Sequence, residues 1–336
     1  MGAWMAGNEP EFQLPFEETW HEQVRASVKQ KFGSQPGIAD YMRSPRPASP
    51  ARHAAISSVL NDFSTHVARH VIEEIFKGKL LYAGGDDVLA MVSVDDLLPA
   101  MLLLRAAYSG VGDVAGLPDY IDLKGLRIGK GYVWLNGRPM LMMGSRATAS
   151  MGAVVAHHQA PLGAVLRHLR EAEKRAKAHK GADGRDRNAF CLRIMKRGGG
   201  EVGITARFWD TADAPTRVAS PAGYLLRLAD ALANTDFSRR AVYKAQAWLA
   251  DMPPRPPADD AAWREMVASY LAFQFEKQRG FRSLAYEAVA LACSDVAPAI
   301  PVPDDRIEHR EAIALEHLLV VAEFFAREGR VFGKGV

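Results

Sequence analysis

The chain has 336 residues, of which 48% are hydrophobic and 24% charged, and its formal net charge is +3. This composition is typical of a soluble globular protein long enough for two domains, and the charge is too small to indicate nucleic-acid binding by itself. Cys191 and Cys293 form no CxxC pair and lack zinc-type spacing with histidine, which argues against a disulfide framework and favours a reducing compartment. Neither a membrane span nor a signal peptide is evident, so we expect a cytoplasmic protein with no membrane partner.

The first strongly periodic segment is 51–76, where apolar residues recur at helical spacing and predict one helix. The preceding residues are rich in Pro, Ser and Gly and predict a surface loop. Two short apolar runs, 80–83 and 88–92, then surround a Gly-containing turn and predict a β-hairpin. Asp95 and Asp96 follow, and N-capping of the next helix together with a favourable interaction with its dipole explains them.

Beyond the hairpin, helical and strand patterns alternate as far as about residue 208. In chain order they predict a helix at 97–107, strands at 132–135 and 148–156, a helix at 161–179, and strands at 188–195 and 202–208. We interpret 109–147 as an insertion with little chemistry. Helical patterns then follow at 222–250, 260–278, 281–293 and 306–328, separated by Pro-rich segments.

This order of elements predicts an α+β fold in which helices pack on a mainly antiparallel sheet in a ferredoxin-like arrangement. We expect residues 1–209 to form this sheet-containing domain and residues 210–336 to form a second, all-α domain built as a helical bundle. One more strand ahead of the predicted elements would complete the sheet.

The turn of the hairpin, Gly84-Gly85-Asp86-Asp87, carries the strongest chemical pattern in the sequence. Two adjacent carboxylates repel each other, and a divalent cation bound between them removes that cost. Mg²⁺ and similar hard cations prefer carboxylate oxygens and also bind substrate phosphates, while glycines let a triphosphate approach the backbone. The alternative is a surface turn in which the same residues serve only turn geometry and solvation.

Around this turn the sequence resembles two related families. The stretch YAGGDDVLAMV, residues 82–92, is similar to a hairpin in the large subunit of type III-B (Cmr-type) CRISPR effector complexes, whose Palm domain is related to the GGDEF diguanylate cyclases. The stretches 148–158 and 161–187 resemble the strand and helix that follow it in both families, and residues 2–7 resemble the opening strand and turn of the CRISPR subunit. The similarity covers residues 1 to about 208, and the rest matches only as a helical C-terminal domain.

The resemblance implies a nucleotide-cyclase Palm fold and a reaction, the conversion of ATP into cyclic oligoadenylates when the complex binds target RNA. The 3′-hydroxyl of one ATP would attack the α-phosphate of another, and pyrophosphate would leave. The resemblance makes Asp86 and Asp87 the catalytic residues that hold two Mg²⁺ or Mn²⁺ ions, and it places Gly84 and Gly85 against the nucleotide. It implies as partners other Cmr-type effector subunits and, through the complex, guide CRISPR RNA and target RNA.

Two further residues enter through the same resemblance. Lys177 would be a cation for the triphosphate, although a solvated helix face is the alternative explanation for it. Ser150 would be a polar group beside the nucleotide, or simply a small residue in a strand.

The sequence also departs from the family pattern. The family's first Palm strand carries an acidic segment that supplies another metal ligand, and the similarity at residues 2–7 begins just after it. We therefore expect either a fragment or a misassigned start of a longer protein, or a truncated homologue without activity. We favour the fragment, because a sheet that lacks this strand would expose unpaired backbone.

Four functions remain open from the sequence. The leading one is a cyclase-type subunit of a CRISPR RNA-guided complex, and the second is a non-catalytic scaffold subunit that holds RNA and protein partners. A free-standing diguanylate cyclase is disfavoured by Val88, where those enzymes have Phe, and by the helical C-terminal half. A polymerase ranks last, because no fingers or template-binding motif is recognisable.

Overall fold

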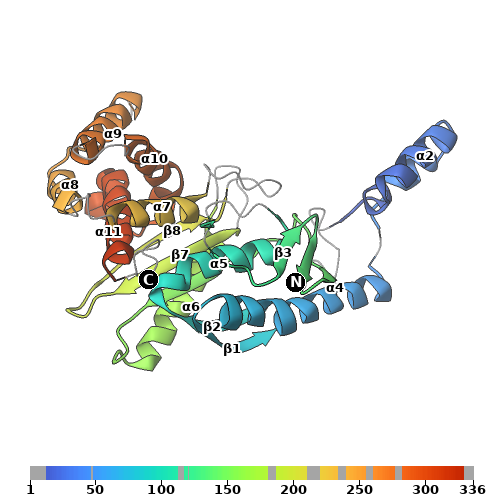
Figure 1. Cartoon of the computed structure of the whole chain (residues 1–336). Coiled ribbons are helices and arrows are strands. Elements are labelled where there is room, and N and C mark those ends of the chain that lie inside the picture. The colour runs from blue at the N-terminus through green and yellow to red at the C-terminus, as the bar shows by residue number, and fades with distance from the viewer. Residues whose placement is uncertain are drawn as a thin grey trace.

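The computed structural model of the chain describes residues 13–46, 48–112, 117–119, 121–180, 187–209, 220–233, 240–254, 260–276 and 282–328. The molecule is elongated, with helix α2 (Glu22–Phe32) projecting at one end and the C-terminal helices gathered at the other (Figure 1). The hairpin and the sheets lie between these two ends. The strand and turn expected at residues 2–7 lie outside the described residues.

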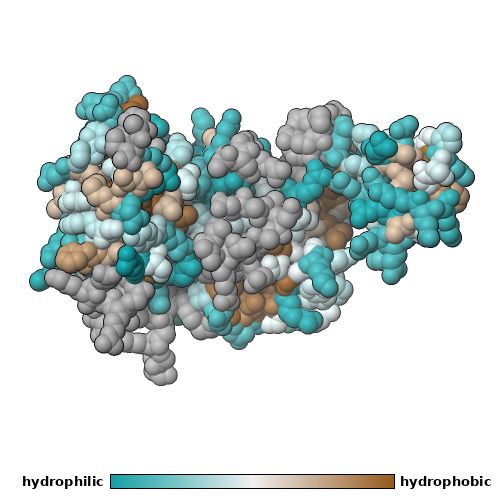
Figure 2. Space-filling view, turned by 90° about the horizontal axis from the view of Figure 1, so that it is seen from above, coloured by the Kyte–Doolittle hydropathy of each residue, from teal (hydrophilic) through white to brown (hydrophobic). Residues whose placement is uncertain are grey.

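The projecting arm is held together by its own local contacts. It contains the 3-10 helix η2 (Phe16–Thr19), α2 and the short helix α3 (Ile38–Arg43), and α2 buries none of its residues. The rings of Phe16 and Tyr41 stack with centroids 4.8 Å apart. In the view of Figure 2, the arm is covered mainly by hydrophilic residues.

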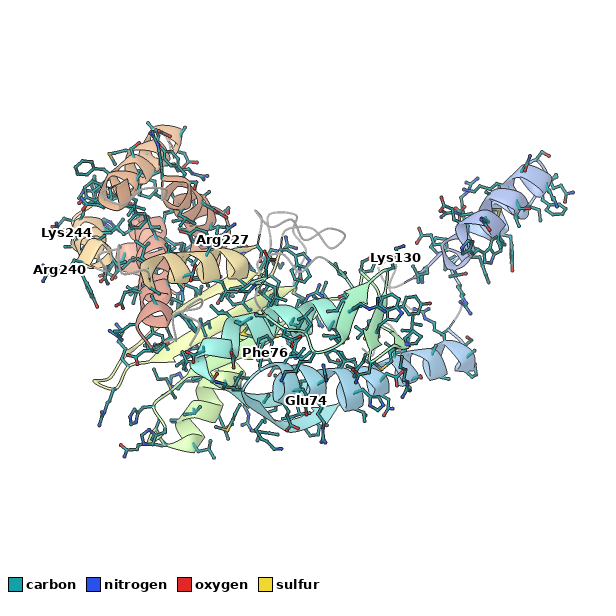
Figure 3. The ribbon with its side chains drawn as sticks, in the orientation of Figure 1. Glu74, Phe76, Lys130, Arg227, Arg240 and Lys244 are labelled. Carbon is teal, nitrogen blue, oxygen red and sulfur yellow. The ribbon has the colours of Figure 1, made fainter. Side chains whose placement is uncertain are left out.

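The helix predicted at 51–76 is confirmed. It begins as α4 (Pro50–Asp62), capped by the hydroxyl of Ser49, and continues through two π-helical stretches, η3 (Phe63–Val67) and η4 (His70–Ile75). Its apolar stripe is buried from residue 59 onward, and Phe76 closes the stripe in the core at the root of the hairpin (Figure 3). Burial of this stripe accounts for the stability of the helix better than intrinsic propensity does.

Within the described residues, eight strands and two helices follow. They are β1 (Gly78–Gly84), β2 (Asp87–Val92), α5 (Val94–Ser109), β3 (Leu126–Gly129), β4 (Tyr132–Leu135), β5 (Arg138–Leu141), β6 (Met151–Val155), α6 (Leu162–Ala178), β7 (Ala189–Met195) and β8 (Glu201–Arg207). The predicted hairpin and the strands near 132, 151, 189 and 202 are therefore confirmed. The insertion contains a three-stranded meander, β3-β4-β5, where the sequence indicated one strand.

The strands differ from the prediction of one mainly antiparallel sheet. Those in the described residues form three separate sheets, β1-β2, β3-β4-β5 and β6-β7-β8, and β6 pairs with β7 in parallel. The parallel pair has a physical reason, because helix α6 crosses over between β6 and β7 and returns the chain to the same end of the sheet. Helix α6 packs on both strands, and its Ala172 and Ala176 contact Cys191.

Helix α5 lies at the centre of this region and is buried on all sides from residue 98 to residue 109. Leu98 and Leu102 pack in a core with the β6-β7-β8 sheet and the C-terminal helices, whereas Leu103 and Ala107 pack in a second core with α4 and the hairpin. A helix that is apolar on every face is stable only between two such cores. Helix α5 therefore couples the hairpin to the rest of the molecule.

The C-terminal half is helical, as predicted. Its α-helices are α7 (Pro221–Ala233), α8 (Arg240–Ala250), α9 (Asp260–Glu276), α10 (Arg282–Leu291) and α11 (Arg310–Glu328), with a π-helical stretch η5 (Ala292–Val296) and the 3-10 helices η6 (Ala297–Ala299) and η7 (Asp304–His309) between the last two. The segment expected at 222–250 is thus two helices, α7 and α8. None of the helices in the described part of the chain is long and apolar enough to cross a bilayer.

The expected domain boundary at 209/210 adjoins residues outside the described ranges. The hydrophobic core continues across it, since Phe208 and Trp209 at the end of β8 share one cluster with Tyr224 and Leu225 of α7. Arg240 and Lys244 of α8 lie on the outer surface of the helical end (Figure 3). The two expected domains therefore pack as neighbours on a common core.

Candidate functional site

The hairpin tip, defined as residues 84–87, has the geometry of a tight two-residue turn. Gly84 pairs with Asp87, so Gly85 and Asp86 form the loop between the strands. Gly85 has φ +62°, whereas Asp86 is not among the residues with positive φ. A positive φ at the first loop position only is the pattern of a type II′ turn, which requires glycine there. The positive φ of this turn is thus sufficient reason for glycine at position 85, whatever the tip binds.

The two glycines of the tip have different surroundings. A side chain at Gly85 would meet no atom within 4 Å, so the space beside it is open. A Cβ at Gly84 would lie 2.4 Å from the hydroxyl of Tyr82, whose ring is 57% exposed. The pairing register shifts between Leu80 and Tyr82, and such a bulge re-aims the side chains next to it. The open approach to the backbone expected at both glycines therefore exists at Gly85, while the Tyr82 ring covers Gly84.

The carboxylates of Asp86 and Asp87 are both exposed at this tip. Exposed, adjacent carboxylate oxygens are the ligands that a hard divalent cation prefers, and Mg²⁺ usually completes its coordination with water and substrate phosphates. The donor set of the tip thus fits such an ion. Among the residues that the structure describes, no group of three or more His, Cys, Asp or Glu side chains could hold a metal. The tip accordingly offers a two-carboxylate site without a third protein ligand from the described residues.

Two carboxylates fix the root of the hairpin. Glu73 accepts the Leu80 backbone N–H at 3.2 Å and binds the Lys79 ammonium at 2.8 Å, and both contacts hold its pKa below the usual range, the Lys79 bond most strongly. Asp96 accepts the Lys77 backbone N–H at 2.8 Å and the Ser93 hydroxyl at 3.0 Å. These bonds join β1 to η4 and the residues that flank the two strands to α5. The base of the hairpin that bears the tip is therefore fixed in place.

The contacts of Asp96 refine the prediction for the start of α5. The N-cap residue is Ser93, and Asp95 and Asp96 lie in the first turn of the helix. Favourable interaction with the helix dipole is thus retained, whereas capping at the N-cap position itself was predicted for the wrong residues.

Helix α5 contains a buried cation that no pattern in the sequence singled out. Arg105 of α5 is fully buried, donates from Nε to the Asn188 side chain at 2.7 Å, and donates from Nη1 to Ser109. Its guanidinium carbon lies 4.6 Å from the centre of the Trp209 ring, and Asn188 donates to the Trp209 carbonyl at 3.0 Å. Burial lowers the pKa of Arg105 to about 9, so the side chain is still a cation at neutral pH. We call these four residues the Arg105 network.

Tyr108 relates this interior to the hairpin tip. Its ring packs edge-on against Phe63 with centroids 5.2 Å apart. Burial chiefly, and next the Asp86 carboxylate, raise the pKa of Tyr108, while Arg105 lowers it. The Asp86 carboxylate of the tip and the buried Arg105 guanidinium thus shift the pKa of the same phenol in opposite directions.

Ser150 directly precedes β6, and its hydroxyl is shielded from solvent without a hydrogen-bond partner among the described residues. A buried hydroxyl that lacks a partner is costly unless water or a ligand supplies one. The neighbouring Gly152 has a structural reason to be glycine, because a Cβ there would lie 2.4 Å from the Glu173 nitrogen of α6. Close packing of α6 on β6 therefore explains the glycine of the Ser-x-Gly pattern.

Lys177 lies in the last turn of α6 and binds Glu173, one turn earlier, at 2.6 Å. Both side chains are about half exposed, which makes this a surface ion pair of small net energy. Within the described part of the chain, no hydrogen bond or ion pair joins Lys177 or Ser150 to the hairpin tip. The structure therefore groups residues 84–87 and leaves these two residues apart from them.

Comparison with known proteins finds similarity over part of the chain. Residues 28–120, which include the hairpin, match the family described as Cas10/Cmr2, second palm domain. The chain is 40% identical over 76 residues to the CRISPR system Cmr subunit Cmr2 of Pyrococcus furiosus, and 33% identical over 120 residues to that of Saccharolobus solfataricus. These alignments cover 22% and 35% of this chain but only 8% and 10% of the two relatives.

The fold agrees with this match. A chain of a structure titled Type III-B Cmr-beta, apo state, aligns over 90% of this protein and 29% of its own length, with a TM-score of 0.53 and 18% identity. At that identity the likeness supports the fold alone. The family match ends before Ser150 and Lys177, so it bears on the hairpin and on neither of those residues. Over these parts of its length, the chain is similar to the second palm domain of the Cas10/Cmr2 family and to the Cmr2 subunits of two CRISPR systems.

Proposed function

We propose that this chain is part of a type III-B CRISPR RNA-guided antiviral effector complex in the cytoplasm, and that its palm domain converts ATP into cyclic oligoadenylates when target RNA binds. The observation that supports this most is the exposed Gly-Gly-Asp-Asp turn on an anchored hairpin, within the residues that match the second palm domain. Phosphoryl transfer depends mainly on positioning and charge neutralisation, and an exposed acidic turn on a fixed support suits both.

Asp86 and Asp87 would hold two Mg²⁺ or Mn²⁺ ions, which supply charge neutralisation for the triphosphate when bound. The 3′-hydroxyl of one ATP attacks the α-phosphate of another and loses its proton to solvent, a new P–O bond forms, and the bond from the α-phosphorus to pyrophosphate breaks. Gly85 leaves open space in which a phosphate can approach the backbone. The bonds of Glu73 and Asp96 keep the two carboxylates from moving away as the charge shifts.

Two residues outside the hairpin would assist the nucleotide. The Ser150 hydroxyl, shielded and without a partner among the described residues, is suited to bond a group of the bound nucleotide. Lys177 would bind the triphosphate after releasing Glu173, an exchange that costs little because exposed pairs one helical turn apart are worth only about 0.3–0.5 kcal/mol. Gly84 would accept the nucleotide once the Tyr82 ring swings away.

A second candidate is a catalytically inactive scaffold subunit of the same kind of complex. It is favoured by the finding that the described residues hold no cluster of three or more potential metal ligands. The exposed cations of α6 would then serve RNA phosphates, in a salt-dependent and sequence-independent way. In either case, the other Cmr-type subunits, guide RNA and target RNA are the proposed partners.

The experiment uses the assembled complex with ATP, Mg²⁺ or Mn²⁺, and target RNA, and it detects oligoadenylates by mass spectrometry. Wild-type complex is expected to form them, and the double variant Asp86→Asn, Asp87→Asn is expected to lose at least about 10³-fold in rate, since both proposed metal ligands lose their charge. Unchanged product from this variant refutes the catalytic assignment. Wild-type complex that assembles and binds target RNA without forming product supports the scaffold.

The chain offers a matched control in Asp304 and Asp305. These residues are also adjacent, exposed carboxylates, but they lie in η7 of the helical half. The double variant Asp304→Asn, Asp305→Asn makes the same change in charge and is expected to retain full activity. Equal loss in both double variants would assign the effect to net charge and not to the hairpin tip.

A further inference from the structure

A pocket lies between part of the β6-β7-β8 sheet and the C-terminal helices. Nothing in the proposed function uses it. Its volume is about 210 Å³. Its polar lining is contributed by α6, β7, β8 and α11, and consists of Arg175, Cys191, Arg193, Glu201, Thr205 and His317. The segment after η6 adds apolar contacts through Ile300 and Pro301. The pocket is therefore walled by both halves of the molecule.

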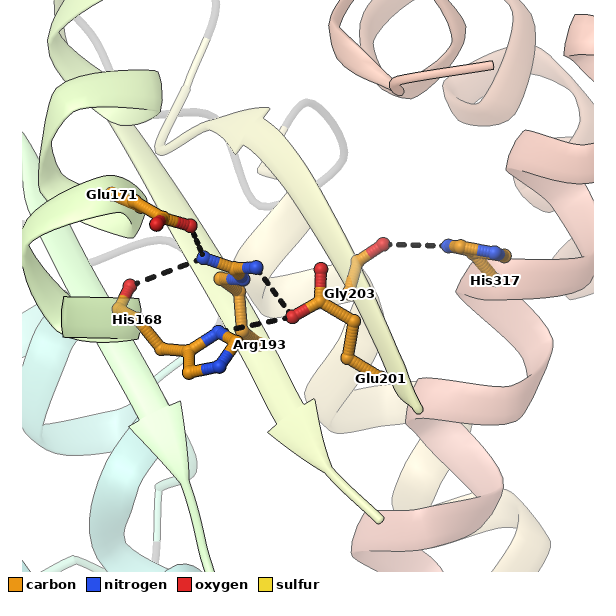
Figure 4. Close-up of polar contacts among 6 residues, drawn as sticks. All are labelled: His168, Glu171, Arg193, Glu201, Gly203 and His317. Atoms are coloured by element: carbon orange, nitrogen blue, oxygen red, sulfur yellow. Dashed lines mark hydrogen bonds and ion pairs between the residues drawn. The ribbon is translucent and has the colours of Figure 1, made fainter. Parts of the chain in front are cut away.

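Arg193 is the most constrained group of this lining. Its side chain, in a residue only 4% exposed, binds Glu171 at 2.6 Å and also binds Glu201, which in turn lies 3.2 Å from His168 (Figure 4). These contacts use the two terminal nitrogens, and the buried Nε–H has no hydrogen-bond partner among the described residues. A buried donor of a cation that lacks an acceptor is expensive, so a ligand that supplies an oxygen there gains that free energy.

Arg175 adds a second guanidinium, whose attraction to the Glu171 carboxylate helps to lower the pKa of Glu171. It is half-buried in the last turns of α6, and no hydrogen bond or ion pair joins it to any described residue. Glu171 and Glu201 are both engaged by Arg193. The positive charge that faces the pocket without a bound carboxylate is thus that of Arg175.

The Thr205 hydroxyl is a third polar group in the lining of the pocket. Burial raises the pKa of the Cys191 thiol, which stays protonated at neutral pH and forms a hydrogen bond with the Thr205 hydroxyl. A hydroxyl can rotate, so that of Thr205 can donate to a ligand in the pocket. His317 fixes the opposite wall, because its Nδ1 donates to the Gly203 carbonyl of β8 at 2.8 Å and so joins α11 to the sheet (Figure 4).

We propose that this pocket binds a small phosphorylated ligand, with one phosphate group held by Arg175, Arg193 Nε and the Thr205 hydroxyl. Three donors that come from α6, β7 and β8 suit a tetrahedral oxyanion, whereas a planar carboxylate is served best by one bidentate arginine. The volume is below the 300–1,000 Å³ typical of sites for drug-sized ligands, so it suits inorganic phosphate or the phosphate end of a nucleotide. A bound phosphate contacts elements of both halves and stabilises their packing, by the general linkage between binding and stability.

The test measures thermal unfolding and calorimetric binding of the full chain with inorganic phosphate, against chloride at equal ionic strength, in EDTA. The chelator keeps the hairpin tip free of metal, which separates this site from the proposed catalytic one. Phosphate is expected to raise the unfolding temperature in a saturable way, both in the wild type and in the Asp86→Asn, Asp87→Asn variant. A second arm compares AMP with adenosine. Tighter binding of AMP than of phosphate identifies a nucleotide ligand, and binding of phosphate alone identifies the free anion.

The decisive variant is Arg175→Gln, because this substitution breaks no ion pair among the described residues. Phosphate affinity is expected to fall by about tenfold or more, as one charged hydrogen bond is lost. The control is Lys174→Gln, an exposed cation on the same helix outside the pocket lining, which is expected to keep wild-type affinity. Thr205→Val, nearly isosteric, provides a second reduction in affinity that does not depend on charge. No phosphate-specific stabilisation, or equal stabilisation in Arg175→Gln, overturns the proposal.

Discussion

The hairpin tip and the Arg105 network place charge in opposite environments, one exposed and one buried. The tip holds two like charges in water, where screening keeps their repulsion small. The network holds one cation in the interior, where its partners among the described residues are neutral acceptors and an aromatic ring. Repulsion between the two carboxylates of the tip therefore costs little free energy, and their oxygens can bind a ligand. In the network, by contrast, every hydrogen bond is needed for stability.

This contrast separates two kinds of sensitivity to mutation. Changes at the tip are expected to affect what the protein binds, with little effect on folding, because the side chains there are exposed and make few contacts. Changes in the network are expected to affect folding first, because they leave a buried cation without its acceptors. Helix α5 connects both regions, so a loosened network would also displace the support of the hairpin.

The largest effect is expected from Asn188→Ala. The substitution removes the acceptor of Arg105 Nε and the donor to the Trp209 carbonyl, and it leaves the buried cation less compensated. We expect the free energy of unfolding to fall by about 3–5 kcal/mol, measured by urea denaturation. Asn136→Ala is the control, because both asparagines have a left-handed backbone, with φ +52° at Asn188 and +51° at Asn136, but Asn136 is exposed. A similar loss in both variants would show that backbone strain, and not the buried cation, is responsible.

A smaller effect is expected from Gly85→Ala. The positive φ of Gly85 is unfavourable for any residue with a Cβ, and we expect a loss of about 1–3 kcal/mol in the free energy of unfolding. Gly84→Ala has no such backbone requirement, and the flexible Tyr82 ring that it meets can move aside, so its loss is expected to be smaller. Chemical denaturation of both variants gives the comparison. If Gly84→Ala lowers the free energy of unfolding more than Gly85→Ala does, the Tyr82 ring cannot move aside as expected.

The smallest effect concerns the root of the hairpin and its dependence on pH. The Lys79 ammonium, and then the Leu80 N–H, depress the pKa of Glu73 in the folded state below its usual value. Glu73 therefore contributes stability that is present above the pKa of the unfolded state and is lost as pH falls through the lower folded pKa. In Glu73→Gln, the decline of the urea midpoint from pH 6 toward the acid region below 4.5 is expected to be shallower than in the wild type. Glu74→Gln, an exposed neighbour whose side chain has no ion pair among the described residues, is expected to leave the decline unchanged.

Much of the candidate site could be predicted because it is local in sequence. Alternating apolar residues around a Gly-Gly pair define the hairpin, and consecutive numbering alone puts Asp86 beside Asp87 at its turn. Helix α5 was predictable for a similar reason, since its residues are apolar over several turns. Ser150 and Lys177 were proposed from resemblance alone. Nothing in the pattern of the sequence placed them beside the tip.

What the tertiary structure decided is long-range. The sequence determines that α5 contains an arginine, but its acceptor on Asn188 lies 83 residues further along the chain. The same holds for the parallel pairing of β6 with β7 and for His317, which reaches Gly203 across 114 residues. Periodicity and turn chemistry act over a few residues and specify elements, whereas a buried polar contact is specified only when packing excludes water from both partners. The acidic turn is thus a property of the sequence, and the buried cation of α5 and the phosphate pocket are properties of the fold.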